Sequence, residues 1–178
     1  MPRCLVYDHA IARRPKISEF EWRAMTRLEA GTKAPAFSLE SDDAVTVSLS
    51  QFSGQRVVLY FYPADDTPGC TKEACQFNEQ LTAFKASKVQ VLGISPDDAG
   101  THQLFRKKYD LNFPLLSDPS KKVMASYGAY GEKMLYGKTV VGTIRSTFLI
   151  GPTGLIERAW YGVRADGHAA KVLSALTS

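Results

Sequence analysis

The amino-acid sequence predicts an α/β domain, with a mixed central β-sheet flanked by helices and a β-hairpin at its N-terminal end. Two near-continuous apolar runs, 57–64 and 89–95, are each followed by a helical pattern, which is typical of buried strands in βαβ units. Apolar and polar residues alternate at 36–39 and again at 45–49, which indicates a hairpin ahead of those strands. The expected architecture is therefore a sheet covered on both faces.

Length and composition favour one soluble core. The chain has 178 residues, 44% of them hydrophobic, and a net charge of +4 without a run of like charges that would indicate nucleic-acid binding. It has neither a signal-peptide pattern nor an apolar stretch long enough to span a membrane, and three cysteines are too few for a secreted disulfide scaffold. We expect a cytoplasmic protein, with residues 1–30 forming an extension that is a short helix or disordered and residues 31–178 forming the domain.

After the first buried strand, a single helix is expected from about Thr71 to Ala86. Its inward face is formed by apolar residues spaced three and four apart: Ala74, Phe77, Leu81 and Phe84. The second buried strand, Val89–Ser95, ends where Ser95-Pro96-Asp97-Asp98 predicts the start of a helix that reaches about Tyr109.

The remaining elements are shorter. Phe113–Ser117 reads as an edge strand because it contains Pro114, and no element is predicted for the Gly- and Tyr-rich residues 128–144. The other predictions are a short helix at 119–127, a hairpin of strands 146–150 and 155–161 across Gly151-Pro152-Thr153-Gly154, and a last helix at 168–176.

Two of the three cysteines, Cys70 and Cys75, follow the first buried strand closely. Cys70 falls in the first turn of the predicted helix, where free N–H groups and the helix dipole favour a thiolate by roughly 0.3–2 kcal/mol. That is too little for nearly complete ionisation at neutral pH, so a nearby cation is needed. Arg145 is the candidate because it directly precedes a strand; the alternative is a solvated residue at a strand end.

Cys75 lies five positions after Cys70. In an unbroken helix this spacing separates the two Cα atoms by about 8.7 Å. A disulfide requires Cα atoms within about 7 Å, so a Cys70–Cys75 bond requires the first helical turns to unwind. Such a pair suits a cycle between a folded dithiol and a locally opened disulfide.

Other interpretations of the cysteines are weaker. Zinc needs clustered ligands, whereas the remaining candidates, Cys4, His9, His102 and His168, are scattered, so no metal site is predicted. The spacing is not Cys-x-x-Cys, no histidine has the neighbourhood of a Cys–His hydrolase, and inert core cysteines remain the blandest alternative. Residues 131–139 resemble a phosphate-binding loop, but have one residue too many between the glycines and follow no buried strand.

These residues carry a family resemblance. Pro63-x-x-x-Thr67-x-x-Cys70 resembles the active-site motif of the peroxiredoxins, and Phe61-Tyr62-Pro63 through Thr67-Pro68-Gly69-Cys70-Thr71-Lys72-Glu73-Ala74-Cys75 resembles their bacterioferritin comigratory protein (PrxQ) branch. The resemblance runs from about Gly31 to the C-terminus. It includes Gly93-Ile94-Ser95-Pro96-Asp97, Phe113-Pro114-Leu115-Leu116-Ser117-Asp118, Tyr136-Gly137-Lys138 and Arg145-Ser146-Thr147-Phe148-Leu149-Ile150.

The resemblance implies a thioredoxin-like fold and a monomeric thiol peroxidase of hydrogen peroxide and organic hydroperoxides that needs no metal or prosthetic group. Cys70 would be the peroxidatic and Cys75 the resolving cysteine, and thioredoxin would reduce the Cys70–Cys75 disulfide. Thr67 and Arg145 would hold the thiolate and the peroxide oxygens, while Pro63 shields the thiolate from water. No nucleic acid or membrane is an expected partner, and Cys4 has no assigned role. A dithiol exchange protein and a redox-sensing interaction protein remain alternatives.

Overall fold

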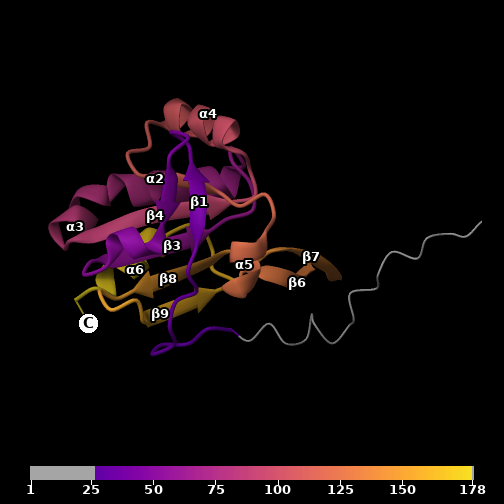
Figure 1. Ribbon diagram of the computed structural model, residues 1–178. Helices are drawn as coiled ribbons and strands as arrows, with labels where there is room; N and C mark the ends of the chain where they lie inside the picture. The colour runs from indigo at the N-terminus through magenta and orange to yellow at the C-terminus, as the bar shows by residue number, and fades with distance from the viewer. Residues whose placement is uncertain (1–26, 178) are drawn as a thin grey trace, which may run out of the picture.

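The computed structural model describes residues 27–177. Its seven-stranded mixed sheet has the order β2-β1-β5-β4-β3-β8-β9, and a separate two-stranded sheet is formed by β6 and β7 (Figure 1). The sheet is flanked by helices on both faces and begins with the predicted hairpin, so the predicted fold class is confirmed. The expected extension at residues 1–30 lies almost entirely outside the described residues.

The hairpin consists of β1 (Ser38–Ser41) and β2 (Thr46–Ser48) and is followed by the 3-10 helix η1 (Leu49–Phe52). The central strands are β3 (Arg56–Phe61), β4 (Val89–Ser95), β5 (Leu115–Ser117), β8 (Ser146–Ile150) and β9 (Ile156–Tyr161). The helices are α2 (Pro68–Glu79), α3 (Leu81–Ala86), α4 (Ala99–Tyr109), α5 (Lys122–Ser126) and α6 (His168–Ser174). The small sheet consists of β6 (Tyr130–Leu135) and β7 (Lys138–Thr143).

Successive residues of β3 contribute to two different cores, because side chains alternate between the faces of a strand. Val58 and Tyr60 pack on one face against α2, α3, α4 and α6. Val57 and Leu59 pack on the other face with residues of α5, η1 and the segment before β1. Five of the six β3 residues are fully buried, which explains why the sequence shows a continuous apolar run there.

The pairing of β3 sets the place of the cysteines. β3 runs parallel to β4 and antiparallel to β8, with Phe61 opposite Ser146. The carboxyl end of β3 therefore lies beside the start of β8, and the residue before β8 lies close to the loop that follows β3. That loop, residues 62–67, leads directly into α2.

The structure corrects three sequence predictions. β5 is not an edge strand, because it lies between β4 and β1. Pro114 precedes β5 by one residue and takes part as an acceptor, its carbonyl oxygen receiving the N–H of Gly93 in β4 at 3.2 Å. The expected single helix at 71–86 is two helices that meet at Gln80, and the helix predicted at Ser95 begins at Ala99 with Asp98 as its cap. The apolar spacing continues across Gln80, so the pattern does not reveal the break.

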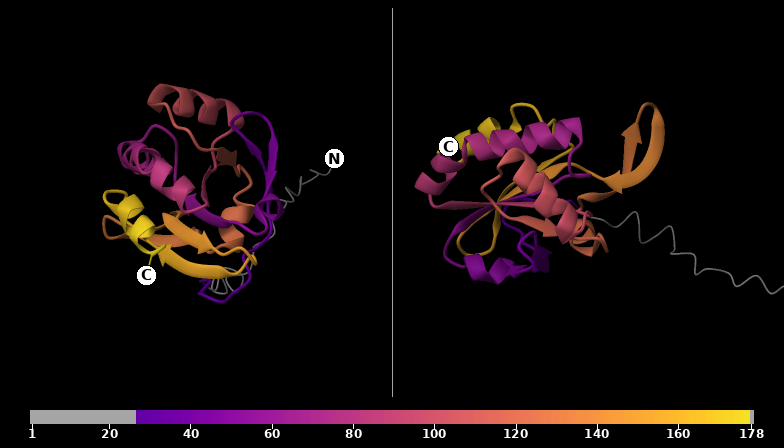
Figure 2. Two further views of the ribbon diagram at one scale, coloured as in Figure 1. Left: turned by 90° about the vertical axis from the view of Figure 1, so that its left-hand side faces the viewer. Right: turned by 90° about the horizontal axis from the view of Figure 1, so that it is seen from above.

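Residues 128–144, for which no element was predicted, contain the β6–β7 hairpin. It projects from the body of the domain, as the right-hand view of Figure 2 shows. Met134, Leu135 and Tyr136 near its tip are exposed. Because most of its side chains are not buried, the hairpin has little of the apolar alternation by which strands are recognised in a sequence.

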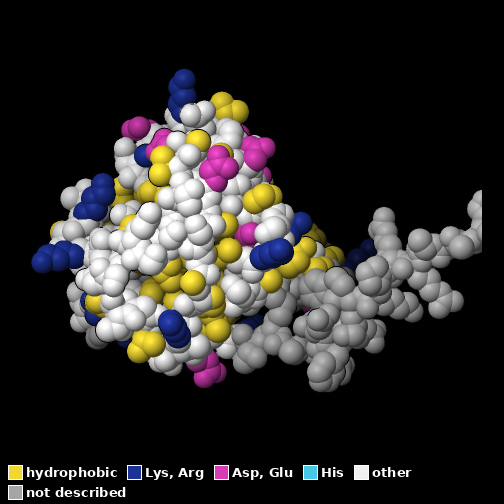
Figure 3. Space-filling view, in the orientation of Figure 1, with side chains coloured by type: hydrophobic (Ala, Val, Ile, Leu, Met, Phe, Trp, Pro, Cys, Tyr) yellow, Lys and Arg dark blue, Asp and Glu magenta, His cyan; other side chains and the backbone are white. Residues whose placement is uncertain are grey.

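On the face seen in Figure 3, basic and acidic side chains are scattered, and neither sign forms a continuous field. None of the helices within residues 27–177 combines the length and hydropathy that a membrane span requires.

Candidate active site

Cys70 lies in the first turn of α2, as predicted. Thr67 is the N-cap of this helix and Pro68 its first residue, a position at which the missing N–H of proline costs no hydrogen bond. The thiol of Cys70 is buried, with a relative exposure of 1% for the residue. Its position places a sulfur near the free N–H groups and the positive end of the helix dipole.

Arg145 precedes β8 and reaches this sulfur. Its Nη2 donates to Cys70 Sγ at 3.3 Å, and its Nη1 donates to Glu73 Oε2. The side chain of Arg145 is 16% exposed. Burial lowers the pKa of this guanidinium, but the charges of Glu73 and Cys70 outweigh that effect and the net shift is upward. The structure therefore brings together the predicted thiol and the predicted cation.

Gly69 lies against this contact. A Cβ added at Gly69 would lie 3.4 Å from Nη2 of Arg145, at the short end of ordinary van der Waals contact. The backbone of α2 therefore approaches the guanidinium closely.

Glu73 is a site residue that sequence analysis missed. It lies three residues after Cys70, on the same side of the helix, and its side chain is completely buried. Burial raises the pKa of Glu73 to about 7, and Arg145 opposes this rise. Its second oxygen, Oε1, has no hydrogen-bond partner among the described residues. The sequence did contain a signal for Glu73. It is a carboxylate on the helix face that the apolar spacing assigns to the core.

Thr67 and Pro63 lie in the loop before α2, as expected, but Thr67 makes a different contact. Its Oγ1 donates to the carbonyl oxygen of Ala64 at 3.2 Å. Pro63 is half-buried next to the fully buried Tyr62. Both residues are close to Cys70 in the chain. The hydrogen bond to the Cys70 sulfur, however, comes from the guanidinium of Arg145.

Cys75 is half-buried further along α2, and both cysteines are free thiols. Burial, and after it the charge of Glu79, raises the pKa of the Cys75 thiol. The guanidinium faces Cys70, so the two sulfurs lie in electrostatically different surroundings. This difference is suited to one nucleophilic thiolate and one thiol that reacts later.

The middle of α2 is fastened to the loop before α6. Gln76 donates through Nε2 to Asp166 at 2.8 Å and accepts the N–H of Gly167 at 2.9 Å. Lys72 forms an ion pair with Asp166 at 2.9 Å. These contacts are exposed, so they restrain α2 weakly compared with its buried face.

The two histidines among the described residues, His102 and His168, are core residues. His168 faces Thr147 Oγ1 at 2.9 Å, and burial, followed by the charges of Lys171 and Arg145, lowers its pKa to about 4. His102 is fully buried beside Asp65.

The geometry agrees with comparisons to known proteins. The AhpC/TSA family profile matches residues 30–159. The chain belongs to the AhpC/TSA family. It is a peroxiredoxin of the Bcp/PrxQ branch, and its enzyme class is that of the peroxidases. The identification by resemblance is thereby confirmed.

Individual peroxiredoxins support this assignment. A Mycobacterium tuberculosis protein named as a candidate peroxiredoxin is 52% identical over 147 residues, which are 83% of this chain and 94% of that protein. Peroxiredoxin Bcp of Bacillus subtilis is 40% identical over 84% of this chain and 95% of its own length. The structure of Xanthomonas campestris peroxiredoxin Q matches with a TM-score of 0.78 and 38% identity, covering 83% of this chain and 96% of that one.

Proposed function

We propose that this peroxiredoxin reduces hydrogen peroxide and organic hydroperoxides with Cys70 as the attacking thiolate. The observation that carries the proposal is the contact of Arg145 Nη2 with Cys70 Sγ at 3.3 Å, at the first turn of α2. A structure of the Xanthomonas campestris bacterioferritin comigratory protein, 37% identical to this chain, was described for insight into that protein's alkyl peroxide reduction activity. This supports the inclusion of organic hydroperoxides among the substrates.

The proposed first step forms a bond between Cys70 Sγ and the nearer peroxide oxygen as the O–O bond breaks. The departing oxygen takes the electron pair and a proton and leaves as water or an alcohol, and Cys70 becomes a sulfenic acid. Charge moves from sulfur to the departing oxygen, so a donor that follows this charge lowers the barrier. Arg145 has the donors for this task. A contribution of Thr67 requires its hydroxyl to turn away from Ala64, to which it donates here.

In the proposed second step, Cys75 condenses with the sulfenic acid; the S–S bond forms and water leaves. Since α2 is continuous from Pro68 to Glu79, this step requires its first turns to unwind and the ties of Gln76 to residues 166 and 167 to loosen. An external dithiol, which we propose to be thioredoxin, then supplies two electrons and restores both thiols. A monomeric, cytoplasmic enzyme remains a prediction.

The test is consumption of peroxide with defined reductants. We expect hydrogen peroxide and an organic hydroperoxide to be consumed in proportion to NADPH in the presence of thioredoxin and its reductase. A protein that exchanges disulfides with thioredoxin but leaves peroxide unchanged would instead be a dithiol exchange protein, and the proposal would be wrong.

Replacing Cys75 by serine is expected to leave one round of Cys70 oxidation intact and to block recycling. The reason is that Cys75 contributes nothing to the attack on peroxide but supplies the sulfur that releases water from the sulfenic acid. A single stoichiometric consumption of peroxide, followed by no thioredoxin-dependent turnover, is the expected result. Turnover at the wild-type rate would show that another thiol resolves the sulfenic acid. The double variant Cys75→Ser, Cys4→Ser would then show whether that thiol is Cys4.

The rate of peroxide reduction should also decrease at acidic pH, and this acidic limb of the pH profile should depend on Glu73. Because its pKa is raised to about 7, Glu73 gains a proton as the pH falls through this value and loses its ion pair with Arg145. The rate of Cys70 oxidation by peroxide should therefore fall below about pH 7. In Glu73→Gln the component of this limb due to residue 73 should disappear; an unchanged pH profile in this variant would remove Glu73 from the account.

The stability has the opposite dependence on pH. Folded Glu73 holds its proton up to a higher pH than the unfolded chain does, so the free energy of unfolding should decrease as the pH rises from about 4.5 to about 7. Chemical denaturation at both ends of this window, with wild type and Glu73→Gln compared, checks the sign.

A further inference from the structure

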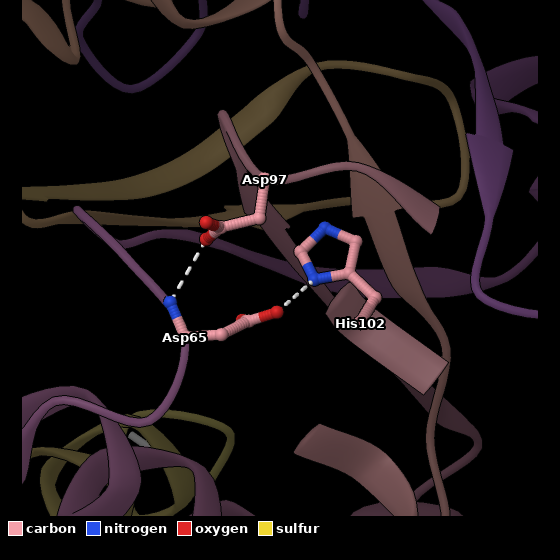
Figure 4. Close-up of side chains that lie close together, drawn as sticks. All are labelled: Asp65, Asp97 and His102. Atoms are coloured by element: carbon pink, nitrogen blue, oxygen red, sulfur yellow. Dashed lines mark hydrogen bonds and ion pairs between the residues drawn. The ribbon is translucent and has the colours of Figure 1, made fainter. Parts of the chain in front are cut away.

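A partly buried polar cluster lies at the loop that carries Pro63 and Thr67. Figure 4 shows its members: Asp65 from that loop, Asp97 from the segment before α4, and His102 from α4. His102 Nδ1 lies 2.6 Å from Asp65 Oδ2, and these two side chains are 0% and 2% exposed. The backbone N–H of Asp65 donates to Asp97 Oδ2 at 2.8 Å.

The hydrogen-bond partners of His102 indicate how many protons its ring and Asp65 hold together. Its Nε2 lies 3.1 Å from the carbonyl oxygen of Leu116, and because a carbonyl only accepts, Nε2 must carry hydrogen. The other nitrogen faces a carboxyl oxygen, so a proton must also lie between Nδ1 and Asp65. The pair is either imidazolium with carboxylate or neutral imidazole with carboxylic acid. In both forms it holds one shared proton and has no net charge, which is compatible with complete burial.

Further polar groups surround the pair. Tyr62 from the same loop donates its hydroxyl to Asp65 Oδ1 at 2.7 Å. Asp97 accepts hydrogen bonds from Ser95 Oγ and from the N–H of Asp65. Asp98 caps α4; its bond with Thr101 and, to a smaller extent, the charge of His102 lower the pKa of its carboxyl. The titratable groups that face the pair among the described residues are thus acids and a phenol.

Hydrogen bonds alone account for the cluster. Both oxygens of Asp65, both nitrogens of His102 and Oδ2 of Asp97 have partners within the protein. A cation at this place would have to displace several of these bonds, so the arrangement fits a shared proton better than a metal ion.

We propose that Asp65 and His102 are positioning residues of the peroxidase reaction, and that their shared proton fastens the 62–67 loop to α4 and β5. Asp65 attaches the loop to His102, and His102 passes the attachment on to Leu116 in β5. Without the proton the neutral ring would carry only one hydrogen, so two acceptors would face each other either at Asp65 or at Leu116, and one end of the attachment would be lost. The loop would then release Pro63, Thr67 and the first turn of α2, in which Cys70 lies. The inference rests on the proposed function of Cys70.

The neighbouring residue offers a matched control. Asp66 also ties the loop to α4, through Lys108 Nζ at 2.7 Å and Tyr109 Oη at 2.6 Å. The Asp66 and Lys108 side chains are 46% and 56% exposed, so water can replace this contact at little cost. Asp66→Asn changes the same kind of group in the same loop, but without the buried proton.

The conservative variant is Asp65→Asn. Its amide can donate to His102 Nδ1 and accept from Tyr62, so it rebuilds the hydrogen bonds around a neutral imidazole without the shared proton. Asp65→Ala and His102→Ala remove the attachment instead. The measured quantity is the rate of Cys70 oxidation by hydrogen peroxide at neutral pH, with folding followed by circular dichroism.

We expect Asp65→Ala to slow Cys70 oxidation about 10- to 100-fold at neutral pH, since small displacements of reacting groups have effects of this size. Asp65→Asn should restore most of the rate, because its amide rebuilds the hydrogen bonds of the attachment. Asp66→Asn should match wild type throughout. Wild-type rates in folded Asp65→Ala, or a folded Asp65→Asn that stays about 10-fold or more slower than wild type, would overturn the proposal; if Asp65→Ala does not fold, Asp65→Asn decides.

A second measurement does not depend on peroxide chemistry. At neutral pH, NMR should show either both nitrogens of His102 protonated, or a neutral ring together with a protonated Asp65 carboxyl. A neutral ring facing an ionised carboxylate would contradict the shared proton. If Cys70 is not the peroxidatic residue, peroxide will not oxidise Cys70 in the wild type either. The NMR result will still report on the pair of Asp65 and His102.

Discussion

Replacing Cys70 by serine should abolish thioredoxin-coupled peroxide reduction. A hydroxyl at this place is not ionised at neutral pH, so the bond to peroxide oxygen is not formed, and Arg145 has no thiolate to face. Serine is close in size to cysteine, so the buried position should tolerate it. We expect the rate of peroxide consumption to fall to that of the reaction mixture without enzyme, measured by NADPH oxidation with thioredoxin and its reductase.

The control is Cys75→Ser, which makes the same atomic change five residues along the same helix. The two variants should differ in one respect: Cys75→Ser consumes a single equivalent of peroxide, and Cys70→Ser consumes none. If Cys70→Ser retained coupled turnover, the assignment of the peroxidatic cysteine would be wrong whatever the behaviour of the other variant.

Replacing Arg145 by alanine should slow the oxidation of Cys70 by about 10²- to 10³-fold, the effect of removing one aimed donor from a charge-stabilising site. The loss has two sources. The thiolate loses its only charged hydrogen-bond donor among the described residues, and the departing oxygen loses the cation that follows its developing charge. Alanine also leaves the buried carboxyl of Glu73 without its partner. Stopped-flow measurement of Cys70 oxidation gives the rate.

Two variants separate these causes. Arg145→Lys keeps a positive charge, but one ammonium does not reproduce the fork that contacts Cys70 and Glu73 through separate nitrogens. It should recover part of the rate. Arg145→Ala combined with Glu73→Gln removes the unpaired carboxyl and should regain stability without regaining activity. Recovery of the wild-type rate in the double variant would show that Arg145 acts by neutralising Glu73 and not on the sulfur.

Sequence analysis predicted those parts of the site that depend on local order along the chain. Pro68 and Gly69 after a buried run indicate a helix start, so the position of Cys70 in the first turn followed from neighbouring residues. Arg145 was found because it stands immediately before a strand, and the register of β8 against β3 brings it to the loop after β3. The assignment of roles to these residues stays a prediction.

The parts that were missed depend on contacts between distant segments. β5 lies inside the sheet because β1 pairs with it across more than seventy residues, and no pattern within Phe113–Ser117 contains that partner. Glu73 and His102 look like ordinary helical residues until their partners, Arg145 and Asp65, are placed beside them. A charge on an apolar helix face indicates a buried partner, but its identity depends on the whole topology.

The break at Gln80 has a consequence for the cost of catalysis. The backbone of Gln80 leaves helical geometry, and α3 then begins separately, with Leu81 and Phe84 buried in the core and the helix packed against β4. Helical order is cooperative along an uninterrupted segment, so fraying of α2 from its N-terminal end has a natural boundary at this residue. We expect the first turns of α2 to exchange amide hydrogens through a low-energy opening, while the amides of α3 exchange only on global unfolding. In the proposed cycle the start of α2 would then lose helical order while α3 keeps its place in the core.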